Sequence, residues 1–126
     1  MRAVDTNVVL RVLTRYEPRQ AEVADDFVRN GAWISHVVLA EVTWALGAVY
    51  ELAPTRIADA IAMLLDHESL AVQDADVVAE ALARFRAHPS VGFADCLILE
   101  VARRAGHGPL GTFDRRLAKL PGTQRL

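Results

Sequence analysis

The sequence predicts an α/β fold in which a small central parallel sheet is flanked by helices, and two observations lead to this prediction. Short apolar runs alternate with segments of helical periodicity along the chain, a pattern typical of parallel α/β proteins. Carboxylates stand directly after two of the apolar runs, at Asp5 and Asp114. Ligands of an open α/β sheet bind at the carboxyl ends of its strands, so Asp5 is expected to face a binding crevice.

The first half of the chain predicts two strands and three helices. Strands are expected over residues 2–5 and 32–35, and helices over residues 7–15, about 18–30 and about 36–51. Pro18 separates the first two helices, and Asn30-Gly31 ends the second because glycine adopts the left-handed conformation of helix ends. Apolar residues surround the third helix, which predicts a helix that is buried or shared with a partner.

The second half continues the alternation and ends in short strands. Helices are expected over residues about 54–67, 74–88 and about 94–105, strands over 70–73, 110–113 and 123–125, and a short helical turn from Arg115 to Leu117. Pro54 suits the first turn of a helix, and Asp74 suits a helix cap. Residues 106–109, Gly-His-Gly-Pro, end the last long helix.

Length and composition point to an ordinary globular protein. With 126 residues the chain is expected to be one domain, and its 52% hydrophobic and 24% charged content is typical of that class. A net charge of −2 excludes a strongly basic nucleic-acid binder. The single cysteine, Cys96, excludes an internal disulfide and predicts a buried, inert thiol. Without a signal segment or a long apolar run, we expect a cytoplasmic protein with no membrane contact.

Two further carboxylates lack a counter-charge nearby in the sequence. The helical neighbours of Glu41, three and four residues away, are all apolar, and residues 91–99 contain no charge besides Asp95. Burying an isolated carboxylate costs several kcal/mol, so such groups are paired, protonated or bound to a metal. The structural alternative to a metal site is an ion pair with an arginine from elsewhere in the fold. For Asp5 the structural alternative is a role as a helix cap.

The acidic residues also suit a particular cofactor chemistry. Asp95 falls in the first turn of a predicted helix, where the helix dipole and free amides favour the ionised carboxylate as a cation ligand. Carboxylate oxygens suit Mg²⁺ or Mn²⁺, which bind through a few Asp or Glu side chains together with substrate phosphate. Four carboxylates therefore predict metal-assisted hydrolysis of a phosphodiester bond.

Four short segments carry a resemblance to a known family. They are similar to the successive acidic motifs of the PIN-domain ribonucleases: Val4-Asp5-Thr6-Asn7, Val38-Leu39-Ala40-Glu41 followed by Trp44, Phe93-Ala94-Asp95-Cys96-Leu97-Ile98, and Thr112-Phe113-Asp114. The chain resembles most closely the VapC-type toxins of bacterial toxin–antitoxin pairs, over essentially its whole length. The resemblance implies a PIN-like three-layer α/β/α fold over residues 1–126 and a Mg²⁺- or Mn²⁺-dependent endoribonuclease that cleaves single-stranded or looped RNA.

The resemblance also implies roles for individual residues and for partners. It implies that four carboxylates form a catalytic and metal-binding quartet, which consists of Asp5, Glu41, Asp95 and Asp114. Asp5 and Asp95 would be the principal metal ligands. Asn7 and Thr112 occupy the family's supporting polar positions, with turn and strand-end hydrogen bonding as the alternative. The family further implies a homodimer in a type II toxin–antitoxin system, with a cognate VapB-type antitoxin that blocks the site.

Two other functions compete with the nuclease. A catalytically idle PIN-like module would bind a protein or RNA through its apolar helices. A phosphoacceptor or phosphatase of another α/β class would require a second aspartate where Asn7 stands, or a lysine after a late strand, and Lys119 lies on the wrong side of Asp114.

Basic and aromatic residues are candidate RNA contacts. Because the chain has one lysine, phosphate contacts would have to come from the arginines that flank the motifs, which are Arg11, Arg15, Arg115 and Arg116. The alternative for each of them is a solvated position on the surface. Aromatic rings stack on bases in single-strand binders. The strand and apolar-helix settings of Trp33 and Trp44 favour packing in the core instead.

Overall fold

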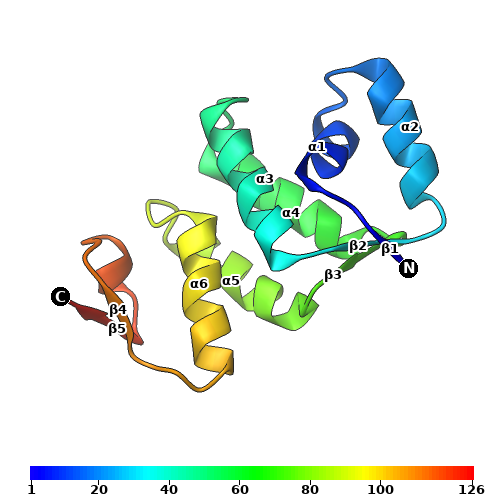
Figure 1. Ribbon diagram of the computed structural model, residues 1–126. Coiled ribbons are helices and arrows are strands. Elements are labelled where there is room, and N and C mark those ends of the chain that lie inside the picture. Colours follow the sequence, from blue (N-terminus) through cyan, green and yellow to red (C-terminus); the bar gives the residue numbers. More distant parts are fainter.

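The computed structural model describes all residues, 1–126, as a mixed α/β fold with six helices (Figure 1). The elements follow in the order β1 (Arg2–Ala3), α1 (Thr6–Thr14), α2 (Pro18–Val28), β2 (Ala32–Ile34), α3 (His36–Ala48), α4 (Pro54–Asp66), β3 (Leu70–Val72), α5 (Ala75–Ala87), α6 (Phe93–Arg104), β4 (Leu110–Thr112), the 3-10 helix η1 (Leu117–Lys119) and β5 (Thr123–Arg125). The α/β class and the order of elements predicted from the sequence are confirmed.

All strand pairs are parallel, but they form two sheets. Strands β1, β2 and β3 lie side by side in that order, with Ala3 opposite Trp33 and Trp33 opposite Ala71. Strands β4 and β5 form a separate pair in which Gly111 lies opposite Gln124.

The separation of β4 from β1 differs from the single central sheet that the sequence predicted. Figure 1 shows β4 and β5 at one end of the molecule and β1–β3 at the other, with α3 and α6 between them. The outer edge of β1 is therefore unpaired, and Arg2 and Ala3 are exposed where a buried strand was expected. Of the predicted first strand, Val4 alone packs into the core.

Helix ends follow local chemistry. Ser35 caps α3, since its hydroxyl accepts a hydrogen bond from the Val38 amide at 3.1 Å, and prolines occupy the first turns of α2 and α4. Gly31 has a φ of +97°, which fits its predicted place after the second helix. Asp74 precedes α5 but makes no capping hydrogen bond, because its own backbone is left-handed, with a φ of +42°.

One hydrophobic core joins most of the elements. Helix α3 buries Leu39, Val42 and Leu46 in it, α4 adds Ile61, and α5 packs extensively against α6. The Cys96 thiol is fully buried there, as predicted, and burial raises its pKa to about 11, which disfavours the reactive thiolate. None of the helices combines the length and apolar character that crossing a bilayer requires.

Candidate active site

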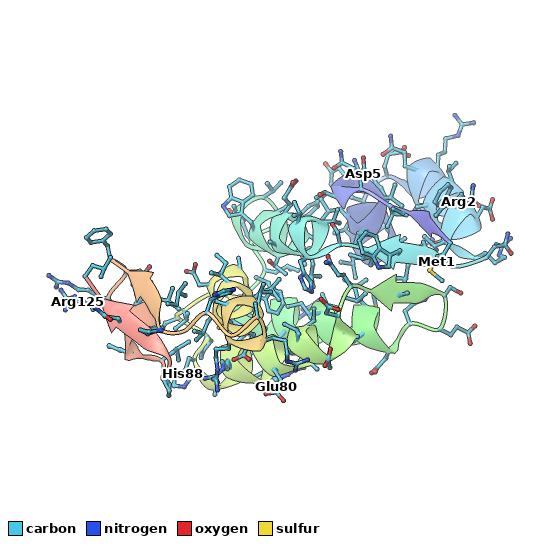
Figure 2. The ribbon with its side chains drawn as sticks, turned by 60° about the horizontal axis from the view of Figure 1, so that its bottom comes forward. Met1, Arg2, Asp5, Glu80, His88 and Arg125 are labelled. Carbon is cyan, nitrogen blue, oxygen red and sulfur yellow. The ribbon has the colours of Figure 1, made fainter.

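Asp5 stands between β1 and α1, and Figure 2 shows it in the opposite half of the molecule from Arg125. Its Oδ1 accepts a hydrogen bond from the Val8 amide at 3.1 Å, so Asp5 is the N-cap of α1. The second carboxylate oxygen makes no hydrogen bond within the chain, and the residue is exposed. The cap considered from the sequence is real, and it leaves one oxygen of Asp5 free for a ligand.

Glu41 lies on the exposed face of α3, the helix that packs against α1. The Thr6 hydroxyl donates to its Oε2 at 3.1 Å. Because Thr6 directly follows Asp5, this hydrogen bond ties the second predicted carboxylate to the first. Asp5, Thr6 and Glu41 therefore form one acidic corner between α1 and α3.

Asp95 lies half-buried in the first turn of α6. Burial and the nearby negative charge of Asp114 raise the pKa of its carboxyl group, in that order of importance. The sequence predicted that the helix dipole would favour the ionised form of Asp95, which corresponds to a lowered pKa. No main-chain amide donates to Asp95, because Gly92 is the N-cap and Asp95 sits inside the turn, so desolvation and repulsion determine the direction.

Asp114 follows β4 and caps the turn that leads into η1. Its Oδ1 accepts hydrogen bonds from the amides of Arg116 at 2.8 Å and Leu117 at 3.0 Å, and these two bonds lower the pKa of Asp114. The Thr112 hydroxyl oxygen accepts from the Asp114 amide at 3.0 Å. Thr112 thus performs the strand-end hydrogen bonding that was the alternative to a direct role.

None of the four carboxylates forms an ion pair, although thirteen arginines are present. The six ion pairs of the structure use other acidic residues, which are Asp25, Asp26, Asp59, Asp76 and Glu100. The most buried of them joins Arg84 to Glu100, a structural pair that sequence reasoning did not single out because the partners are far apart in the chain. The four predicted carboxylates therefore take no part in the ion pairs of the fold, although the charge of Arg116 contributes to lowering the pKa of Asp114.

The four carboxylates fall into two pairs. Asp5 and Glu41 share the corner between α1 and α3, and the negative charge of Asp114, after β4, acts on Asp95 at the start of α6. We expected all four to converge in one hollow, but no three acidic, histidine or cysteine side chains are grouped closely enough to hold one ion. The reason lies in the sheet, because β4 pairs with β5 and not with β1.

Two further residues bear on the site. Asn7 is exposed at the start of α1 and makes no hydrogen bond through its side chain. Trp44, expected in the core, is 69% exposed, and Trp33 is 37% exposed. The core prediction for Trp44 is wrong because the core covers the stripe of α3 that contains Leu39, Val42 and Leu46. Trp44 lies on the opposite stripe, three residues after Glu41.

Comparison with known proteins identifies a family for this chain. The family model described as PIN domain matches residues 2–122, nearly the whole chain. The match supports a nuclease-type function, and nucleases with this domain typically use divalent metals. No curated protein and no solved structure matches the chain.

Proposed function

Because the chain belongs to the PIN domain family, we propose that it is a Mg²⁺- or Mn²⁺-dependent endoribonuclease acting on single-stranded or looped RNA. The observation that carries this proposal is a set of four carboxylates that form no ion pair within the fold. We assign the catalytic and metal-binding roles to Asp5, Glu41, Asp95 and Asp114. Asn7 and Thr112 support them.

The donor chemistry of both carboxylate pairs fits a hard divalent cation. Mg²⁺ commonly binds through one or two carboxylates, with waters and substrate phosphate completing its octahedral shell. When bound, such a cation lowers the pKa of a coordinated water and neutralises charge on the phosphoryl group. In Asp5 and Asp114, main-chain amides hold one carboxylate oxygen and leave the other free, so the helix caps fix the orientation of these donors.

The test is RNA cleavage by Asp5→Asn and Asp95→Asn in the presence of Mg²⁺. Each substitution removes a charged oxygen donor while conserving volume. We expect a loss of at least about a hundredfold, because changing even the outer partners of a metal ligand costs roughly 10–100-fold. Asp26→Asn, which changes an exposed carboxylate paired with Arg29, is the matched control and should cleave as the wild type does. Undiminished cleavage by both site variants would refute the assignment.

We propose further that this nuclease is the toxin of a type II toxin–antitoxin pair. It would act in the cytoplasm as a homodimer, and a VapB-type antitoxin would block its site. Exposed apolar side chains on α6, Ile98 at 51% and Val101 at 39%, support contact with a protein partner. Induction of the chain should arrest growth of a bacterial host, and the product of the gene immediately upstream should relieve the arrest. Growth that continues during induction contradicts the toxin role.

The division of the carboxylates into two pairs favours one alternative, a catalytically idle PIN-like module that binds protein or RNA. Calorimetric titration with Mg²⁺ and Mn²⁺ separates the two proposals. Heat of binding that disappears in Asp95→Asn supports the nuclease. Absence of both heat and cleavage in the wild-type protein supports the idle module.

A further inference from the structure

A cleft of about 350 Å³ opens between α1 and α3, directly beside the acidic corner. Thr6, Asn7 and Arg11 line it from α1, Glu41 and Trp44 line it from α3, and Tyr50 closes it after the end of α3. Its volume lies at the lower end of the range that small-ligand sites occupy. The cleft thus has room for a small polar group beside a proposed catalytic carboxylate.

Trp44 supplies the aromatic wall of this cleft. It lies three residues after Glu41, so the two side chains share one face of α3, and its side chain is 69% exposed. Trp44 also lines a neighbouring hollow together with Phe93 and Ala94, which directly precede Asp95 in α6. The indole therefore lies beside Glu41 and beside the start of α6, the helix that carries Asp95.

Arg11 supplies a cation on the opposite wall. Its Nε donates to Gln20 Oε1 at 2.5 Å and its Nη1 to the Tyr50 hydroxyl at 3.4 Å, so neutral partners position the guanidinium. Tyr50 is itself held by an edge-to-face contact with Tyr16, with ring centroids 6.2 Å apart. Arg11 forms no ion pair, so its charge is uncompensated and roughly three of its five N–H donors stay free.

From these contacts we infer that the cleft binds one nucleotide of single-stranded RNA, with the base stacked on Trp44 and a neighbouring phosphate on Arg11. The inference rests on the proposed nuclease function and names the substrate subsite beside it. Stacking on an aromatic side chain requires an unpaired base, because bases within a duplex present no free face. A nucleotide held on Trp44 lies beside Glu41 and next to the start of α6, so Trp44 and Arg11 are positioning residues for the substrate.

The charges around Trp44 favour RNA over a protein partner. The centre of a protein–protein interface is enriched in aromatic residues and arginine but depleted of glutamate and aspartate, so the carboxylate beside Trp44 is the feature that disfavours a protein partner. Here the exposed indole has a carboxylate from Glu41 one turn away and an unpaired guanidinium from Arg11 across the cleft. A base on an aromatic platform next to a cation that meets the phosphate is the usual composition of a single-strand site.

Binding measured without metal tests this inference separately from catalysis. A short fluorescein-labelled single-stranded RNA and its duplex are titrated with the full chain in EDTA, and anisotropy is recorded. The variants are Trp44→Ala, Trp44→Phe and Arg11→Met. Val37→Ala is the matched control, since Val37 is also 69% exposed on α3 but lies outside the cleft. Circular dichroism and light scattering monitor folding and oligomeric state.

Trp44→Ala should weaken single-strand binding roughly 5- to 150-fold, the value of one stacked base, whereas Trp44→Phe should recover most of the affinity. Arg11→Met should reduce the slope of log K against log salt by roughly 0.7, as expected for one lost phosphate contact on a single strand. Val37→Ala should match the wild type, and the duplex should bind weakly to every variant.

Unchanged RNA affinity in Trp44→Ala overturns the inference, and so does a change in oligomeric state without a change in affinity, which identifies the cleft as a protein interface. Neither result bears on the nuclease proposal, which is tested by cleavage with Asp5→Asn and Asp95→Asn. If both of those variants cleave normally while Trp44→Ala loses binding, the subsite is retained and the catalytic assignment fails.

Discussion

Asp5 and Asp114 show how one carboxylate combines a structural and a chemical role. In each, Oδ1 caps the helical turn that follows a strand, and the other oxygen makes no hydrogen bond within the chain. A cap orients the side chain with main-chain amides that are themselves fixed by the turn, so the free oxygen points in a defined direction. At these positions the helix cap and the proposed metal ligand are therefore compatible functions of the same residue.

Arg84 is the residue whose ion pair should contribute most to stability. It pairs with Glu100, whose side chain is 11% exposed and whose next basic neighbour, Arg103, lies 3.7 Å away. Arg84→Met should lower the free energy of unfolding by about 3 kcal/mol, because it leaves a nearly buried carboxylate largely uncompensated. Arg86→Met, which breaks an exposed pair with Asp59, should cost about 0–1 kcal/mol. Urea unfolding measures both, and equal losses would contradict the prediction.

At the scale of elements, the start of α6 matters most, because it carries Asp95. Gly92 immediately precedes the helix with a φ of +83° and a ψ of 143°, a backbone conformation that residues other than glycine rarely adopt. An added Cβ would meet no atom within 4 Å, so the constraint comes from the backbone alone. This glycine allows the loop after α5 to turn directly into the helix that presents Asp95.

Gly92→Ala should therefore lower the free energy of unfolding by about 1–3 kcal/mol through backbone strain. Gly47, inside α3, is the matched control. Its φ is ordinary, and an added Cβ would lie 3.5 Å from the Ile57 side chain, an ordinary contact, so Gly47→Ala should stabilise the protein by about 0.4–1 kcal/mol. Chemical denaturation of both variants should show effects of opposite sign. A neutral result for Gly92→Ala would show that the loop relaxes without strain.

For the whole molecule, short-range sequence patterns predicted where each helix and strand lies. They did not predict which distant elements pack against one another. Periodicity, prolines and glycines act within a few residues, and they located the helices and strands to within about three residues, as with α3, predicted to end near residue 51 and ending at Ala48. Which strand pairs with which depends on contacts across the chain, and β4 pairs with β5. That pairing separates Asp114 from Asp5. The exposure of Trp44 likewise depends on which face of α3 the other helices cover.

The environment of Asp95, which is half-buried and feels the charge of Asp114, leads to a prediction about how metal binding changes the stability of the protein. Without metal, Asp95→Asn should raise the melting temperature, because burial and Asp114 disfavour the charged form of Asp95 in the folded state. With Mg²⁺ at about a hundred times its Kd, binding to the folded state stabilises the wild type by about 2.7 kcal/mol. In a domain of this size that corresponds to a shift of roughly 10 °C. Asp95→Asn should lose most of this shift, so the order of the two proteins reverses when metal is added.

Differential scanning calorimetry in EDTA and in Mg²⁺, with NaCl matching the ionic strength, measures both effects and separates binding from charge screening. Asp26→Asn serves as the control, because it removes one exposed negative charge outside both carboxylate pairs and should shift with Mg²⁺ as the wild type does. If Mg²⁺ raises the melting temperatures of Asp95→Asn and Asp26→Asn equally, the cation acts on the general negative charge of the chain and Asp95 is not a ligand. A reversal confined to Asp95→Asn ties the gain in stability to the carboxylate that burial and Asp114 hold in an unfavourable charged state.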